Sequence, residues 1–303
     1  MRSLTRVAPR LRPSTVLFGT LLWLVIGLGI VVTLLPFLTS LTTSFMPKQY
    51  AMSFPPKLWA PRWILDNYVW AWKSGGFSRY IRTTIVYASV TGLSATLTSA
   101  LGGYTFSRMR FPSRDKLFLI ILAVMMIPGS VTLVPLFILM VRWPLAGGNN
   151  ILGQGGSGFY NTWAGLLLPG LFGPGTIFLM RQFFQTLPQE LEDAARMDGC
   201  GELQIWWRIA MPLAMPALVV VFLFQFTGSW NGFMWPLVIA RSPMLYTVQV
   251  GLQVFSTQII GQFALTGEVC HAAVKQAATV ITILPIMVVF VAGQRYFTRG
   301  ITL

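Results

Sequence analysis

The chain has 303 residues, of which 54% are hydrophobic and only 10% are charged, and its formal net charge is +14. A soluble domain carries roughly 25% charged residues, so this composition excludes an ordinary water-soluble protein. Two cysteines and one histidine are too few for a disulfide framework or a Cys/His zinc site. The basic residues are scattered between apolar runs, which indicates the charge bias of a membrane protein rather than a nucleic-acid-binding surface.

Six apolar runs are long enough to cross a bilayer, which takes about 20 residues of helix. They are 16–41, 81–106, 117–141, 163–184, 216–239 and 272–292. The first run is too long for a signal peptide and no small-residue cleavage site follows it, so we expect a retained anchor. Pro169 and Pro174 interrupt the fourth run, and neighbouring helices or water must satisfy the carbonyls that they free. The sequence therefore predicts an all-α membrane protein with a tail at 1–15 and one transmembrane domain at 16–303.

Lysine and arginine set the orientation of the spans. With the N-terminus inside, 13 of the 22 basic residues lie in cytoplasmic segments, including four in the tail and four in "SRMRFPSRDK". Both termini are therefore predicted to be cytoplasmic. On this topology Cys200 is cytoplasmic and Cys270 lies near the outer face, so the two cannot pair within the chain.

Two outer loops are distinctive. In "PKLWAPRWILDNYVWAWKSGGF" the helical spacing of apolar residues predicts a short amphipathic helix at the membrane interface. The loop 145–162 is rich in glycine and asparagine and is predicted to be flexible. Because it lacks the GxxxxGK[ST] spacing and any lysine, it is not a phosphate-binding loop.

Small residues recur every four positions in the second span, at Ala95, Ser99 and Gly103. Such a face allows another helix to approach closely, but membrane helices are often rich in small residues in general. The sequence leaves both interpretations open.

The segment "LPQELEDAARMDGCGELQIWWRIAMPLAMP" holds five of the eight acidic residues of the chain. Thr186 and Gln189 match a capping box, with Pro188 in the first turn of the helix that would follow. Leu187, Leu191, Ala194 and Ala195 form an apolar stripe on that helix.

Gly199 can adopt the left-handed conformation that closes this helix. A second short helix is predicted from about Glu202 to Ala210, where Pro212 stops it, and Pro216 starts the fifth span. A long elbow of this kind is costly to order unless something binds it, which favours a docking surface for a protein partner. Catalysis is disfavoured, because Asp193 and Asp198 do not share a helix face and no histidine or nucleophile accompanies them.

The segment "ELEDAARMDGCGELQIWWRIAMP" resembles the EAA loop of ABC importer permeases. Its flanks "GSWNGFMWPLVIA", "LDNYVWAW", "YTFSRMRFPSRDKLF" and "QRYFTRGIT" resemble the carbohydrate-uptake branch, in particular its maltose-system-like second permease. This sequence departs from the family pattern at Asp193, where the family has glutamate, at Cys200, where it usually has alanine, and at Gly232, where an acidic or polar residue is frequent.

The resemblance implies that the loop 186–215 docks into a separate ATPase subunit. The residues carried over to this dock are Glu192, Asp193, Ala194, Ala195, Asp198 and Gly199. It also implies a second permease forming a heterodimer, two ATPase subunits, an extracytoplasmic solute-binding protein and a bacterial inner (plasma) membrane. The chain itself has no nucleotide-binding motif, so the partner ATPase is expected to bind ATP and Mg²⁺, and we expect neither a cofactor nor enzymatic activity in this chain.

Polar residues within spans are candidates for function because they are costly in lipid. In the fifth span, aromatic and amide groups suited to sugars predict a substrate path at Gln225, Thr227, Trp230 and Asn231. The alternative is that Asn231 makes a structural hydrogen bond and Trp230 is an interfacial anchor. Near the sixth span, Glu268, His271 and Lys275 could gate the outer mouth, although snorkelling of Lys275 to water is favoured.

The function predicted from these features is import of a sugar or oligosaccharide. An ABC permease for another solute, such as glycerol phosphate, is an alternative. A stand-alone secondary transporter would require acidic residues within the spans and two similar halves, and the sequence shows neither. A membrane scaffold would leave the polar residues of the fifth span unexplained.

Overall fold

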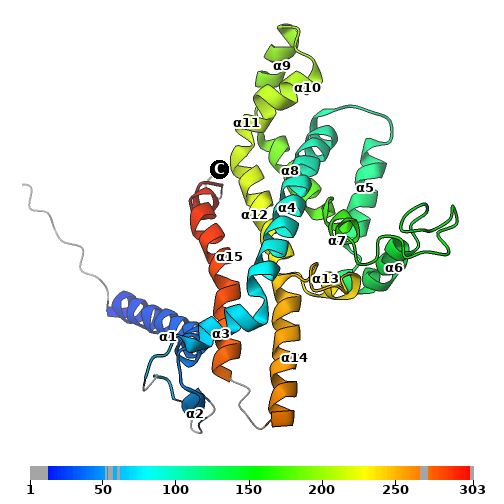
Figure 1. Cartoon of the computed structure of the whole chain (residues 1–303). Helices are drawn as coiled ribbons and strands as arrows, with labels where there is room; N and C mark the ends of the chain where they lie inside the picture. Colours follow the sequence, from blue (N-terminus) through cyan, green and yellow to red (C-terminus); the bar gives the residue numbers. More distant parts are fainter. Residues whose placement is uncertain (1–12, 52, 54–56, 60–61, 267–271, 301–303) are drawn as a thin grey trace, which may run out of the picture.

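The computed structural model describes residues 13–51, 53, 57–59, 62–266 and 272–300 (Figure 1). These residues form helices and turns, with no strand among them. The longer helices are α1 (Pro13–Ser44), α4 (Phe77–Arg108), α5 (Arg114–Met125), α6 (Gly129–Val141), α8 (Pro174–Thr186), α12 (Met215–Asn231), α14 (Val248–Thr266) and α15 (Ala272–Gly300). The shorter ones are α2 (Lys48–Ala51), α3 (Asp66–Gly75), α7 (Trp163–Leu167), α9 (Glu190–Met197), α10 (Glu202–Ile205), α11 (Met211–Leu213) and α13 (Met234–Ile239), with a 3₁₀ turn at Leu168–Gly170 and a π-helical turn at Trp206–Ala210.

Four stretches of the described chain are long and apolar enough to cross a membrane. They are Phe18–Ser44, Phe77–Arg108, Trp163–Thr186 and Ala272–Gln294, and they correspond to the first, second, fourth and sixth predicted spans. Two bent pairs reach the same criterion only when their halves are taken together: Arg114–Met125 with Gly129–Val141, and Glu202–Leu213 with Met215–Asn231. In the second pair the bend is 78°, so the charged segment before α12 leaves the line of the helix, and we treat only α12 as the membrane-spanning part.

The third predicted span, 117–141, is not one helix. α5 and α6 meet at an angle of 103°, and Pro128 between them has extended backbone with ψ 134°. Proline lacks an N–H and disfavours helical backbone at the residue before it, so the helix ends there although the sequence stays apolar.

The fifth predicted span, 216–239, is also shorter than expected. α12 ends at Asn231 because Gly232 is extended, and α13 follows as a separate helix. The helix α14 was not predicted at all. Its four glutamines lower its hydropathy, so it does not stand out as an apolar run.

The two distinctive loops differ in how well they were predicted. The short helix predicted in the first of them is present as α3, and its position at a membrane interface stays a prediction. The loop 145–162, predicted to be flexible, is instead internally bonded: the Asn149 amide donates to the carbonyls of Val141 (2.9 Å) and Trp143 (3.0 Å) and accepts from the backbone of Gly156 (2.9 Å). In this loop asparagine side chains supply hydrogen-bond partners for backbone groups.

α4 lies at the centre of the bundle (Figure 1), packed against α8 on one side and α12 on another. Ala95, Ser99 and Gly103 are buried, and the Ser99 hydroxyl bonds that of Thr176 in α8 at 2.5 Å. A Cβ atom on Gly103 would lie only 2.6 Å from the Cβ of Met180. The small face therefore is a helix-packing face, and of the two interpretations close approach is confirmed.

Opposite ends of the bundle carry different structures (Figure 1). The helices α9 to α11 project at one end of α4, and α14 extends from the other end. α1 stands apart: none of its residues from Phe18 to Leu41 is buried, and it packs mainly against α15.

Replacing Gly103 by alanine should separate α4 from α8. The new methyl group would meet Met180 Cβ and the Arg181 backbone nitrogen at 2.6 and 2.8 Å, and overpacking of this kind costs about 1–3 kcal/mol. Gly102→Ala is the matched control, since its Cβ would make ordinary contacts of 3.4 Å or more with Ile177. The apparent melting temperature in detergent should fall for Gly103→Ala and not for Gly102→Ala. Equal temperatures for the two variants would contradict the packing described.

Candidate functional site

The candidate site is the projecting arm, which we define as residues Glu190–Leu213 and which contains α9, α10, the π-helical turn and α11. The predicted capping box at its start is wrong. α8 continues through Thr186, whose hydroxyl donates to the Phe183 carbonyl, and α9 begins only at Glu190 without a side-chain cap. Pro188 explains the break, because it holds Leu187 in extended backbone (ψ 141°) and separates the two helices.

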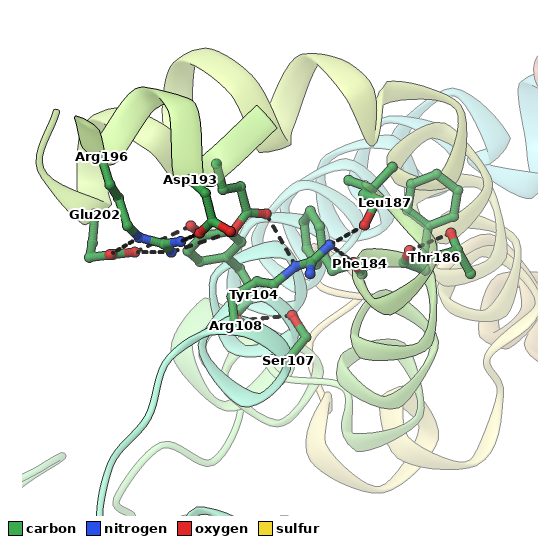
Figure 2. A network of polar contacts seen from close by, with 11 residues as sticks. Tyr104, Ser107, Arg108, Phe184, Thr186, Leu187, Asp193, Arg196 and Glu202 are labelled. Atoms are coloured by element: carbon green, nitrogen blue, oxygen red, sulfur yellow. Dashed lines mark hydrogen bonds and ion pairs between the residues drawn. The ribbon is translucent and has the colours of Figure 1, made fainter. Parts of the chain in front are cut away.

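A buried ion pair fixes the arm to the bundle (Figure 2). Glu192 in α9 is only 2% exposed, and its Oε1 lies 3.1 Å from Nε of Arg108 at the end of α4. The same guanidinium donates from Nη2 to the carbonyls of Phe184 (2.6 Å) and Leu187 (2.5 Å). Carbonyls at the end of a helix have no partner within it, so Arg108 also caps α8. One side chain thus joins α4, α8 and α9.

A second arginine holds the arm in shape (Figure 2). Arg196 in α9 donates to Asp193 (2.8 Å) and, through Nε and Nη2, to the two oxygens of Glu202 in α10 (2.8 and 3.2 Å). These hydrogen bonds lower the pKa of Glu202 and raise that of Arg196, so both groups stay charged. The bridge crosses the corner between α9 and α10 and fixes the angle of the two helices.

Gly199 makes this corner, as predicted. Its φ is +82°, and no atom lies within 4 Å of the position that a Cβ would take. The site therefore needs glycine for its backbone conformation rather than for space.

The predicted apolar stripe of α9 is only partly the buried face. Ala195 packs among buried residues that include Ile205 and Ala210, but Leu191 and Ala194 are exposed. Glu192 takes the inner position because Arg108 neutralises its carboxylate, a contact that periodicity cannot reveal.

The outer surface of the arm is apolar at its tip. Met197 is 88% exposed and Leu203 is 69% exposed, on either side of the Gly199 corner. Neither residue was predicted to be functional from the sequence. Their positions beside the glycine that ends α9 could have indicated exposure, because side chains at a corner between two helices have few neighbours to cover them.

The six predicted docking residues fall into two groups. Asp193, Ala194, Asp198 and Gly199 lie on the exposed surface, whereas Glu192 and Ala195 are buried and hold the arm. The Asp198 side chain has no bonding partner within the described part of the chain. A docking role for these residues remains a prediction.

The predicted path residues also separate. Trp230 is 1% exposed, donates from Nε1 to the Thr282 carbonyl (3.3 Å) and stacks on Phe226, so it joins α12 to α15. Gln225 is half-buried and lies 3.5 Å from the Gly170 carbonyl. Thr227 is half-buried and Asn231 exposed, and the Asn231 amide donates to the Thr227 carbonyl (3.1 Å). These two offer polar groups that the chain's own packing does not cover.

The residues predicted near the outer ends of the spans fall partly outside the structure. Glu268, Cys270 and His271 lie outside the described residues. Lys275 is exposed on α15.

Glu192→Gln should loosen the arm. It leaves the Arg108 charge without its buried partner, and breaking such a pair costs about 3–5 kcal/mol. Hydrogen exchange of peptides from 190–205 should therefore speed up. Asp193→Asn is the control, because its pair with Arg196 is exposed and worth about 1 kcal/mol or less. If both variants exchanged at the same rate, the Arg108–Glu192 pair would not anchor the arm.

The contribution of Glu202 should depend on pH. Because its pKa is lowered in the folded protein, its stabilisation is complete above the usual glutamate pKa of about 4.3 and is lost as the pH falls through the lowered value. The melting temperature of Glu202→Gln should thus lie below that of the wild type at pH 6–7, and the two should converge below pH 4. Glu190→Gln removes an exposed carboxylate and is the control: its melting temperature should match that of the wild type at pH 6–7, so there is no difference to disappear in acid. A difference for Glu202→Gln that persists in acid would exclude the ion pair as its cause.

Comparison with known proteins identifies the family. Residues 92–303 match the family described as "Binding-protein-dependent transport system inner membrane component". The arabinooligosaccharides transport system permease protein AraQ of Halalkalibacterium halodurans is 32% identical over 78% of this chain and 77% of its own length. The inner membrane ABC transporter permease protein YcjP of Escherichia coli is 31% identical over 91% of this chain and 92% of its own.

A solved structure shares the fold. A chain of a bacterial ABC transporter involved in the import of the acidic polysaccharide alginate superimposes with a TM-score of 0.80, at 24% identity, and the match covers 96% of this chain and all of that chain. The family match and the two relatives above 30% identity lead to one conclusion: the chain belongs to the inner membrane components of binding-protein-dependent transport systems.

Proposed function

We propose that this chain is a permease subunit of an ATP-driven importer in a bacterial inner membrane, and that it carries a sugar or oligosaccharide. The arm carries this proposal, because it projects from the bundle, has an apolar tip and is joined to the ends of α4 and α8 through the buried Arg108–Glu192 pair. The sugar is supported by a relative of this chain that is named as a transporter of arabinooligosaccharides.

The arm suits a docking element for a separate ATPase. Its tip presents Met197 and Leu203 with small or acidic residues between them, and exposed apolar groups of this kind typically mark protein contacts. We therefore place the arm, and with it both termini, on the cytoplasmic side. ATP and Mg²⁺ would be bound by two copies of that ATPase, and the role of this chain is mechanical.

The ionic connection provides the means of coupling. Arg108 ties α9 to the ends of α4 and α8, so a displacement of the arm moves both helices rather than bending a loop. α4 in turn bonds α12 through the hydroxyls of Thr91 and Ser229, 2.8 Å apart. Motion at the arm would thereby reach the helix that carries the path residues.

The remaining partners follow from the family and from α1. The name of the family implies a binding protein that delivers the solute from outside. We propose that the uncovered surface of α1 contributes to contact with a second, different permease that completes the path. Thr227 and Asn231 would line this chain's half, with Gln225 deeper, whereas Trp230 supports the path from behind. These side chains are neutral, which favours a sugar over a phosphorylated solute.

Loss of the ATPase from a variant of the corner tests the proposal. The tagged protein is purified in mild detergent from its native membranes, and the co-purifying proteins are identified by mass spectrometry. The wild type should bring down an ATPase and a second permease. Gly199→Asp should lose the ATPase, because aspartate strains the φ of +82° and displaces the tip.

Gly201→Asp is the matched control. It adds the same charge two residues away, at a backbone with φ −75° and open space, where aspartate suits the start of α10. It should keep the ATPase. Met197→Asp, which alters the tip without straining the backbone, should lose it. Purification of the wild type without any ATPase would refute the proposal.

A further inference from the structure

α14 is unusual for a helix outside the membrane spans. Its 19 residues, Val248–Thr266, include four glutamines and no charged residue. Water-facing helices normally carry charged side chains on their exposed face. A polar face made of amides and hydroxyls alone offers hydrogen bonds to a neutral ligand.

The orientation of α14 is fixed by its buried face. Val248 is fully buried, and its N–H donates to the Thr84 hydroxyl of α4 at 2.7 Å. Phe255 packs edge-on against Phe77 of α4, with ring centres 5.3 Å apart. Gly251 leaves room for Tyr80, whose ring would lie 2.1 Å from a Cβ at that position. α14 therefore cannot rotate to bury its amides.

The uncovered amides continue the line of the path residues. Gln249 is half-buried, and its Nε2 lies 3.5 Å from Oδ1 of Asn231, at the end of α12. Gln253 follows one turn later on the same face and is exposed, without a bonding partner in the described part of the chain. The result is a row of neutral amides that starts at Asn231 and runs outward along α14, away from the arm.

We propose that Asn231, Gln249 and Gln253 bind the hydroxyl groups of a neutral saccharide on the outer part of the path. This inference rests on the proposed function and adds a binding site to it. Each amide has two N–H donors and a carbonyl acceptor, which matches sugar hydroxyls that both donate and accept. Successive amides one helical turn apart can bind successive units of one oligosaccharide. An anionic sugar would need arginine or lysine to pair its charge, and the row contains neither.

Uptake in the native bacterium provides the test. Uptake of radiolabelled arabinotriose, maltotriose, cellotriose, raffinose and a trimer of galacturonic acid is measured with and without the gene. One neutral oligosaccharide should depend on the chain. For that sugar, Gln253→Leu and Gln249→Leu should each raise the KM of uptake about fivefold, the effect of one lost hydrogen bond, and the double variant should raise it further.

Gln258→Leu is the matched control, because Gln258 is exposed on the same helix but nine residues after Gln249 and so on the opposite face. It should leave the KM unchanged, and Gln253→Asn should keep most of the affinity. All variants must reach the membrane in wild-type amounts and co-purify the ATPase, which separates loss of binding from loss of assembly.

The outcomes distinguish failure of the proposed import function from failure of the proposed binding site. If deletion of the gene reduces the uptake of no sugar, the proposed function fails and the inference falls with it. If uptake of a neutral sugar depends on the chain but the Gln249 and Gln253 variants behave like Gln258→Leu, the import function stands and the amide row is not a binding site. Dependence of the acidic trimer alone would also overturn the inference.

Discussion

The structure depends on one guanidinium group. Arg108 ends α4, neutralises the buried carboxylate of Glu192 and bonds two carbonyls at the end of α8. Without it, the Leu187 carbonyl would lose its side-chain donor, and the buried carboxylate of Glu192 would keep only Arg196, whose Nη2 lies 3.5 Å from its Oε2. A buried charge without a close partner is costly. Arginine suits the position because it remains charged and presents several donors in a fixed plane. The ionic contact thus makes the projecting arm a continuation of the bundle.

α4 distributes this connection through the molecule. Its small face brings α8 within backbone distance, and its hydroxyl at Thr91 contacts α12. The buried Trp230 then links α12 to α15. Small residues give close approach, and the few polar contacts between helices fix their register. A force applied at the arm therefore meets a continuous set of helix contacts, and these contacts leave Asn231, one of the residues proposed to line the path, exposed.

Much of this arrangement could be predicted from local pattern. The apolar runs located α1, α4 and α15, and the spacing of small residues identified the packing face of α4. Gly199 marked the corner because glycine readily adopts the left-handed backbone that ends a helix. The contacts between distant segments could not be predicted. The resemblance assigned Glu192 to the docking surface, whereas its ion pair with Arg108, a residue far away in sequence, makes it a buried residue. Trp230 was assigned to the path because its chemistry suits sugars, but only the packing of α12 on α15 decides where its ring points. The breaks at Pro128 and Gly232 lie in runs whose hydropathy alone is continuous, and α14 was missed because the same glutamines that define its surface make it less apolar.

The position of α1 has a consequence for biosynthesis. Its main contact within the chain is with α15, which is synthesised after the other described helices. From the time Ser44 is inserted until Ala272 is made, α1 must remain in the bilayer with lipid as its main neighbour. Within Phe18–Ser44 the most apolar 18-residue stretch has a mean hydropathy of 2.6, the highest value among the four long spans. This meets the requirement, because such a helix is stable in lipid without protein contacts. α4 is less apolar and packs mainly against α8 and α12, so it gains these stabilising contacts only after both have been synthesised, whereas α1 is stable in lipid from the start.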